Sequence, residues 1–161
     1  MQTNNNMITD ITEMDSLSGD KAHIYSVILD DDEKTLLERF FNENAAYKND
    51  LKKVLYKIHV MANDTGCRRD FFKEGEGALG DGMVALRGTG NLRLYGIYFH
   101  DALILLGSGG YKPPGIAAYQ DYPPLNEKAQ QMRDVAKEIN RMISENTLTV
   151  KEDGTLDFIK I

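Results

Sequence analysis

The sequence predicts an α+β fold in which a small antiparallel sheet packs against an N-terminal helical hairpin and a C-terminal helix. Three segments carry apolar residues at helical spacing, two of them before residue 66 and one after residue 125. Short alternating segments typical of strands lie between them, and this middle region holds ten of the fourteen glycines, from Gly66 to Gly109. A chain of 161 residues with 42% apolar residues is long enough to build one such core.

The beginning of the chain is expected to be a tail followed by one strand. Residues 1–20 are polar and acidic and show no apolar repeat, so we expect a flexible acidic tail before a folded domain over residues 21–146. The segment His23–Leu29 is rich in β-branched and aromatic residues and is the expected first strand. Three aspartates at 30–32 end this strand, and one of them is expected to cap the next helix.

Two amphipathic helices are expected next, over about residues 33–46 and 50–63. The polar segment at 47–49 separates them, so they are expected to form an antiparallel hairpin. Gly66 follows the second helix and suits a left-handed cap position.

The remaining chain predicts an antiparallel meander, a third helix and a terminal hairpin. The expected strands cover residues 71–72, 83–87, 92–99 and 102–106. His100-Asp101 is the expected tight turn between the last two of these strands. The third helix is expected at about 126–145, and residues 147–161 are expected to be a C-terminal β-hairpin extension that turns at Asp153-Gly154.

Composition and charge limit the class of protein. The chain has one cysteine, no basic and apolar leader, and no apolar run near the length of about 20 residues that a membrane span needs. We therefore expect a cytoplasmic protein that does not associate with membranes. The net charge of −6 divides into −5 over residues 1–66, +1 over 67–119 and −2 over 120–161, so the middle of the chain is compatible with a nucleic-acid partner.

Several features that suggest chemistry have ordinary explanations. The glycine-rich stretch Gly75–Gly82 lacks the Gly-Lys-Ser/Thr ending of a P-loop, and we interpret it as a loop between strands. The three histidines show no metal-ligand spacing, so no metal site and no small-molecule cofactor are expected. Cys67 precedes Arg68-Arg69, which favours a lowered thiol pKa, but a packed and inert thiol is the preferred interpretation.

A set of basic and phenolic residues is the main candidate for a functional site. Arg87 and Arg93 lie on neighbouring predicted strands, Lys112 follows the next strand, Tyr119 lies in the loop beyond it, and Tyr95 shares a face with Arg93. Metal-free RNA cleavage needs cations to stabilise charge on the phosphate, together with groups that move protons to and from the reacting oxygens. The alternative is that these residues are ordinary solvated side chains on an exposed sheet face.

The strand Leu92–Phe99 and the segment Ala102–Lys112 that follows it resemble the central strand pair of the RelE/ParE toxin superfamily, in particular its HigB-like branch. Ile24–Leu29 followed by a helical hairpin is similar to the opening of that fold, and the helix from Asn126 is similar to the one that follows in HigB-like members. The resemblance covers roughly residues 22–145.

This resemblance implies a toxin-like component of a toxin–antitoxin system that acts as a metal-independent, ribosome-associated mRNA endonuclease. Its implied partners are a cognate antitoxin protein, the ribosome and mRNA. Arg93 is implied at the scissile phosphate, Arg87 as a further basic group, and Lys112 and Tyr119 in proton transfer. The residues expected to contact RNA are Lys73, Tyr95 and Tyr111.

Two other functions are compatible with the sequence. Toxins of this superfamily are usually small and strongly basic, whereas this chain is longer and acidic. It could therefore be a non-catalytic protein-binding module of the same fold, with tyrosines forming the contact surface. The third possibility is a phage-type accessory protein that shares only the architecture.

Overall fold

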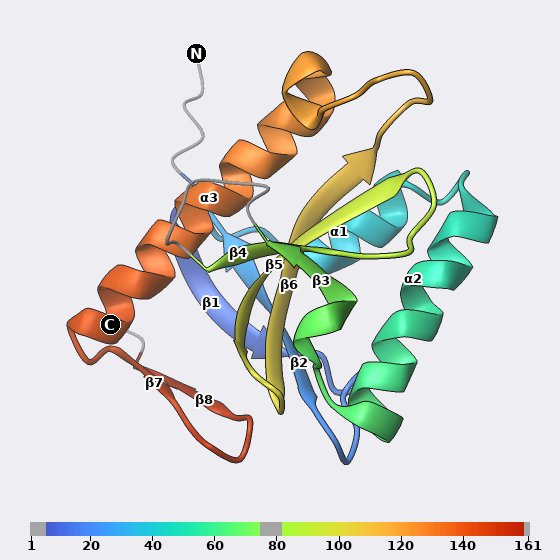
Figure 1. Ribbon diagram of the computed structural model, residues 1–161. Coiled ribbons are helices and arrows are strands. Elements are labelled where there is room, and N and C mark those ends of the chain that lie inside the picture. The colour runs from blue at the N-terminus through green and yellow to red at the C-terminus, as the bar shows by residue number, and fades with distance from the viewer. Residues whose placement is uncertain (1–5, 75–81, 160–161) are drawn as a thin grey trace.

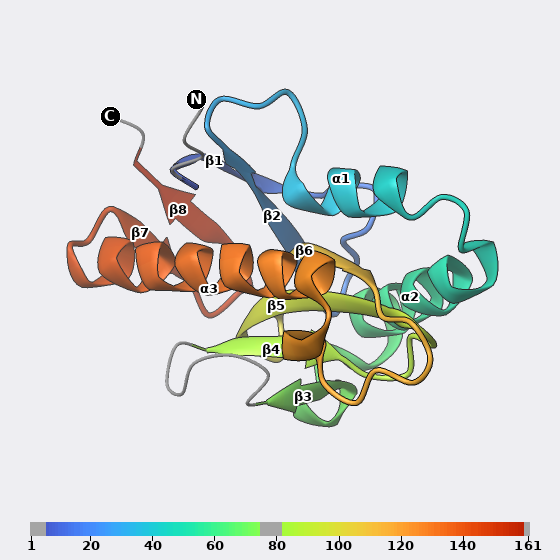
Figure 2. The same cartoon turned by 90° about the horizontal axis from the view of Figure 1, so that it is seen from above.

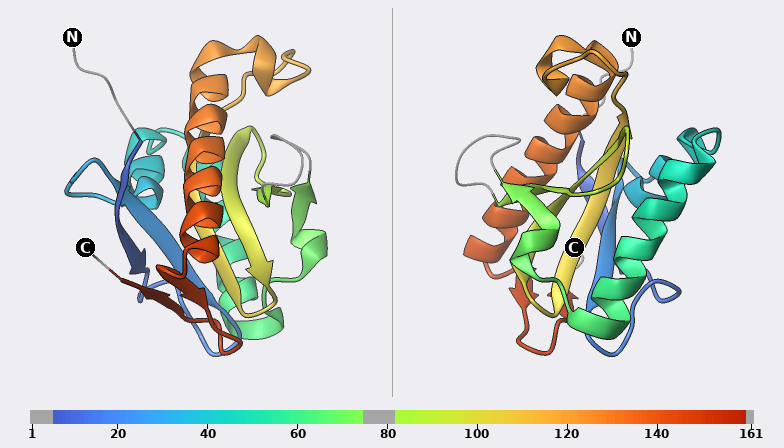
Figure 3. Two further views of the ribbon diagram at one scale, coloured as in Figure 1. Left: turned by 90° about the vertical axis from the view of Figure 1, so that its left-hand side faces the viewer. Right: turned by 45° about the vertical axis from the view of Figure 1, so that its right-hand side comes forward.

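The computed structural model describes residues 6–74 and 82–159, in which a six-stranded sheet lies between helices on both faces (Figure 1). The strands follow the order β1-β2-β6-β5-β4-β3, so β1 and β3 are the two edges. Helix α2 packs on one face and α3 packs on the other, as the right-hand view of Figure 3 shows. Helix α1 contributes Leu36 to the core beneath α3, and Leu37 and Phe40 to the core beneath α2. The predicted α+β class is confirmed.

The sheet is larger than predicted and is not purely antiparallel. β2 (His23–Leu29) pairs in parallel with β6 (Leu103–Tyr111), from His23 opposite Leu103 to Tyr25 opposite Leu105. All other neighbouring strands pair antiparallel. The expectation of a small antiparallel sheet is wrong at this pair, because the pairing joins segments about eighty residues apart and no local pattern encodes it.

The expectation of a flexible tail is wrong for β1 (Ile8–Glu13), which pairs antiparallel with β2 as an edge strand. A register shift between Ile8 and Asp10 breaks the two-residue alternation that identifies a strand. Only Ile11 is buried in this strand, so the segment shows no apolar repeat even though its backbone is fully part of the sheet.

The first helix is shorter than predicted, and its cap is a different residue. α1 (Leu36–Glu43) begins after Thr35, whose Oγ1 accepts a hydrogen bond from the Glu38 N–H at 3.1 Å. The Glu38 carboxylate accepts one from the Thr35 N–H at 3.0 Å, which completes a capping box. None of the three aspartates at 30–32 caps α1. At the other end, the Asn44 side chain donates to the Phe40 carbonyl and closes the last turn.

The second helix ends in a wider turn than an α-helix has. α2 (Lys48–Val60) continues into a single π-helical turn at Met61–Thr65, and Gly66 follows with a φ of +79°. The predicted antiparallel meander is present beyond it. Its strands are β3 (Phe72–Glu74), β4 (Met83–Leu86), β5 (Leu92–His100) and β6, and a short 3-10 turn at Arg69–Phe71 leads into β3. Most of the glycine-rich stretch, residues 75–81, lies outside the described residues.

β6 is longer than predicted because its glycines allow close packing. A Cβ atom at Gly109 would overlap the Arg93 carbonyl of β5, and one at Gly107 would overlap the Met132 side chain of α3. The glycines therefore do not end the strand. They let β5 and α3 approach it from two sides.

The C-terminal part is α3 (Pro123–Ser144) followed by the hairpin of β7 (Leu148–Val150) and β8 (Leu156–Phe158). A 3-10 turn at Tyr119–Asp121 precedes α3. α3 starts three residues earlier than predicted, because Pro123 and Pro124 occupy its first turn, where a missing N–H is tolerated. The hairpin turns at the predicted Asp153-Gly154, where Gly154 has a φ of +92°.

The hairpin packs into the same core as α3. Leu148 is 1% exposed, and the Leu156 N–H donates to the Tyr25 hydroxyl at 3.1 Å. Within residues 6–74 and 82–159, no helix combines the length and the apolar character that crossing a bilayer requires.

The capping box makes a stability prediction. Thr35→Ala removes the hydroxyl that accepts the Glu38 N–H, so we expect the free energy of unfolding in urea to fall by about 1 kcal/mol. Thr149→Ala, at an exposed position of β7, is the control and should change it by less than about 0.5 kcal/mol. Equal losses in the two variants would show that the cap does not stabilise α1.

Candidate functional site

Three cationic residues that the sequence singled out meet at one corner of the sheet, where β4 and β6 end and β5 begins. Arg87 follows β4 directly and Arg93 is the second residue of β5, so both lie at the same end of the antiparallel β4–β5 pair. Arg93 in turn pairs with Gly110 of β6, and the Lys112 N–H donates to the Asn91 carbonyl at 2.7 Å. Figure 2 shows this side of the sheet, with β3 and β4 at the edge away from β1. We call Arg87, Arg93 and Lys112 the basic corner.

Arg93 is held in place by the backbone around it. Its Nη1 donates to the carbonyls of Gly90 at 2.8 Å and Leu92 at 3.0 Å, and the side chain is half-buried. Within the described part of the chain, its Nε and Nη2 groups make no further hydrogen bond. The planar guanidinium therefore has one side anchored and its other N–H groups available for an anion.

The other two cations are less constrained. Arg87 is exposed, and its Nε donates to the Phe72 carbonyl at 3.1 Å. Lys112 is half-buried, and its Nζ lies 3.4 Å from the Ala117 carbonyl. The Asp50 carboxylate of α2 accepts a hydrogen bond from the Asn91 N–H at 3.1 Å, in the turn that precedes Arg93. This arrangement favours binding of a phosphate group.

The remaining predicted site residues do not join the basic corner. Tyr95 points to the same face as Arg93 but is fully buried in the core beneath α3, so it cannot stack on a base. Tyr111 lies on the opposite face and stacks on Tyr47, with ring centroids 4.3 Å apart. Lys73 is exposed on the edge strand β3. The backbone of Tyr119 lies in the short 3-10 turn before α3, and its side chain lies outside the description.

The histidines lie away from the basic corner and have their own partners. His100 is at the far end of β5 from Arg93, where its Nε2 lies 2.9 Å from the Lys151 carbonyl. His23, at the start of β2, pairs with Glu13 at 2.6 Å, and His59 near the end of α2 lies beside Asn63. Among the residues that the structure describes, no three His, Cys, Asp or Glu side chains are placed to hold a metal ion.

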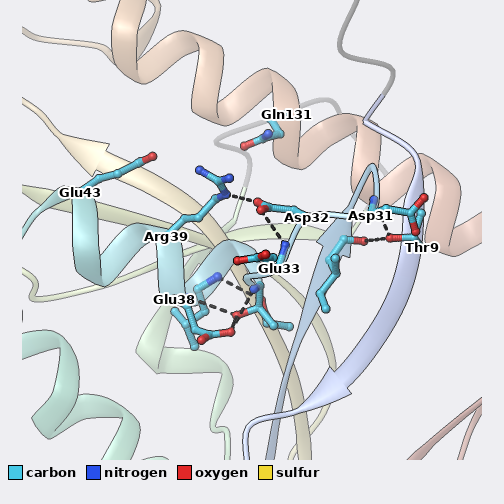
Figure 4. A network of polar contacts seen from close by, with 12 residues as sticks. Thr9, Asp31, Asp32, Glu33, Glu38, Arg39, Glu43 and Gln131 are labelled. Carbon is cyan, nitrogen blue, oxygen red and sulfur yellow. Dashed lines mark hydrogen bonds and ion pairs between the residues drawn. The ribbon is translucent and has the colours of Figure 1, made fainter.

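A polar cleft of about 420 Å³ opens between α1 and α3, on the other side of β6 from β5. β2 and β6 diverge beyond Tyr25 and Leu105, and α1 begins in the gap, where the Leu37 N–H donates to the buried Ser26 hydroxyl at 3.2 Å. Figure 4 shows Arg39 of α1 bonded to Asp32, with Glu43 and Gln131 nearby. The lining residues are Leu29, Asp30, Asp32, Leu36, Arg39, Phe40, Glu43, Ser108, Gly109, Lys128 and Gln131.

Two ion pairs neutralise most of the charge in this cleft. Arg39 pairs with Asp32, and Lys128 of α3 pairs with Glu43 of α1 at 2.9 Å across the opening. No pattern in the sequence indicates this cleft, because Glu43 and Lys128 are 85 residues apart and carry no spacing signal. The Lys128–Glu43 pair links α3 to α1, and the Arg39–Asp32 pair links α1 to the segment after β2, so the cleft has a structural role that needs no ligand.

The Asp32–Arg39 pair makes a prediction about pH. The hydrogen bond from the Arg39 guanidinium lowers the pKa of Asp32. The pair therefore stabilises the fold above the ordinary aspartate pKa, and this contribution is lost as the pH falls through the lowered value. We expect Arg39→Ala to raise the Asp32 pKa in an NMR titration of the side-chain carboxyl, while Arg133→Ala on α3 leaves it unchanged. An unshifted Asp32 in Arg39→Ala would contradict the assignment.

Cys67 makes a prediction about reactivity. It is 0% exposed, and burial, with a smaller contribution from Asp101, raises the pKa of its thiol to about 12. The neighbouring arginines therefore do not activate it, in agreement with the inert-thiol interpretation. At pH 8 we expect iodoacetamide to alkylate the folded protein at least about 100-fold more slowly than the urea-unfolded protein. Comparable rates in the two states would contradict the burial of this thiol.

No family model, curated protein or solved structure matches this chain.

Proposed function

We propose that this chain is a toxin-like, ribosome-associated mRNA endonuclease of a toxin–antitoxin system, with a RelE/ParE-like arrangement of its elements. The observation that carries the proposal is the placement of three cations at one end of the sheet, with Arg87 directly after β4, Arg93 at the start of β5 and Lys112 directly after β6. Three positive charges at one corner suit a phosphodiester, whose negative charge increases when a nucleophile attacks phosphorus.

The order of elements supports this arrangement. β2 is followed by α1 and α2, then by the antiparallel strands β3 to β6, and then by α3. These are the elements on which the resemblance to HigB-like toxins rests. β1 and the β7–β8 hairpin are additions at either end of this set.

The proposed reaction cleaves RNA at a phosphodiester. The 2′-oxygen attacks the adjacent phosphorus and gives its proton to a base, the bond from phosphorus to the 5′-oxygen breaks, and that oxygen takes a proton from an acid. Arg93 is proposed to hold the non-bridging phosphate oxygens through its free N–H groups, assisted by Arg87. Lys112 and Tyr119 are the proposed proton-transfer groups. The metal-independent character of this reaction is part of the proposal.

The competing function is a non-catalytic protein-binding module of the same fold. The net charge of −6 and the burial of Tyr95, one of the three residues expected to contact RNA, favour this alternative. A phage-type accessory protein would equally lack cleavage activity. Both alternatives predict that substituting the cations of the basic corner changes neither the growth of a cell that expresses the protein nor the cleavage of a reporter mRNA.

The test is induced expression in a bacterial host, with growth and cleavage of a reporter mRNA as the two measurements. The intact protein should arrest growth and cut the reporter, and Arg93→Ala should reduce cleavage by about 100-fold or more because an anchored cation is lost from the phosphate. Arg133→Ala, which removes an arginine from α3, is the matched control and should behave like the intact protein.

The folded state of each variant is checked by thermal unfolding of the purified protein, because Arg93 also bonds two carbonyls. Arg87 is exposed, so Arg87→Ala is a second variant, and it leaves the hydrogen bonds of Arg93 to the two carbonyls intact. Normal growth and an uncut reporter with folded intact protein would reject the nuclease and favour the binding module.

A further inference from the structure

The charge of this acidic protein is strongly uneven along the chain. Residues 48–73 contain seven lysines and arginines against three aspartates, a net charge of +4, whereas the whole chain carries −6. The rest of the chain therefore carries −10. The segment extends across residue 66, so the charges of residues 1–66 and 67–119 each include only part of it. The segment comprises α2, its π-helical turn and the start of β3.

The lysines of α2 lie on its outer surface. Only Val54 and Ile58 of this helix are buried, so most of its circumference faces outward. Lys48, Lys52 and Lys53 are exposed, and Lys57 is half-buried with its Nζ 5.4 Å from the centre of the Phe71 ring. From Lys48 to Lys57 the helix rises by about 14 Å, at about 1.5 Å per residue.

Two large side chains stand exposed among these lysines. Tyr56 is 67% exposed and Leu55 is 43% exposed, although the inner face of α2 is fully packed. The acidic residue of this helix, Asp50, is already committed to the Asn91 N–H at 3.1 Å and lies 3.5 Å from the Lys53 ammonium. The outer face of α2 is therefore a basic surface with an exposed phenol at its centre. We call Lys48, Lys52, Lys53 and Tyr56 the α2 face.

The α2 face lies beside the basic corner. Asp50 of α2 binds the backbone of the turn between β4 and β5, and the Lys57 Nζ would lie 3.1 Å from a Cβ atom placed at Gly88 in the same turn. Arg87 and Arg93 flank that turn. α2 and the basic corner therefore adjoin at the turn between β4 and β5, although α2 packs on the sheet face opposite to the one that Arg93 shares with Tyr95.

We propose that the α2 face binds the phosphate backbone of double-helical RNA, next to the basic corner that takes the phosphodiester to be cut. The proposal deepens the proposed function, on which it rests for the role of the corner. Lysine ammonium groups are point charges that neutralise phosphates without reading base edges, so this binding is independent of sequence. A double helix is favoured over a single strand because one exposed aromatic ring cannot provide the successive stacking contacts that single-strand sites use.

The test measures the affinity of the full-length protein for a fluorescein-labelled RNA hairpin by anisotropy, between about 50 and 200 mM salt. Because each lost phosphate contact reduces the slope of log affinity against log salt by about 1, the double variant Lys52→Gln/Lys53→Gln should lower that slope by about 2. The matched control Lys34→Gln/Lys137→Gln removes two exposed lysines elsewhere and should leave the slope unchanged.

Binding of poly-glutamate and of an unpaired RNA strand is measured in the same way. Equal slopes for the α2 variant and the intact protein, with both folded by thermal unfolding, would overturn the proposal, and so would equal losses in the α2 and control variants. Binding of poly-glutamate as tight as that of the hairpin would also overturn it, in favour of an acidic protein partner. Tighter binding of an unpaired RNA strand would reassign the α2 face to single strands.

The cleavage assay remains a separate measurement. A protein that binds the hairpin through α2 but does not cut the reporter would reject the nuclease and retain the α2 face. If the protein cuts the reporter but its salt slope for the hairpin is unchanged by the α2 substitutions, the α2 face is rejected and the nuclease is retained.

Discussion

The parallel pairing of β2 with β6 is the constraint on which the rest of the fold depends. Parallel neighbours cannot be joined by a tight turn, so the chain between them must cross over, and here the crossover contains α1, α2 and the strands β3 to β5. The two paired segments are buried on both faces, which requires helices above and below. Their divergence beyond Tyr25 and Leu105 opens the gap where α1 begins and where the polar cleft lies.

The same arrangement separates the charges of the protein. Acidic residues follow β2 directly and continue along α1, and at the polar cleft two of them are paired with Arg39 and Lys128. The basic residues of α2 lie beside the turn between β4 and β5, which carries the arginines of the basic corner. A net charge of −6 therefore describes neither side of the molecule. A polyanion is attracted by the local field of the α2 side, since fields at a surface follow the nearest charges.

In the candidate site, alternation along a strand predicts the face on which a side chain lies but not whether the side chain is buried. Arg93 and Tyr95 are two residues apart on β5 and point to the same face, as the sequence pattern predicts. Arg93 is half-buried and Tyr95 is fully buried. The reason is that α3 packs on the sheet over Tyr95, whereas its first turns lie near Gly110 and leave the corner beyond it uncovered. A pattern with period two identifies the face of a strand. It carries no information on which part of that face another element covers.

The sequence by itself determined the elements whose signals are local. The apolar stripe of α3, the composition of β2 and the Asp153-Gly154 turn each depend on residues a few positions apart, and the structure confirms all three. Tertiary structure alone decided the strand β1, the parallel pair, the burial of Tyr95 and the cleft closed by Glu43 and Lys128. Each of these depends on contacts between distant segments, whose free energy exists only once the chain has brought them together.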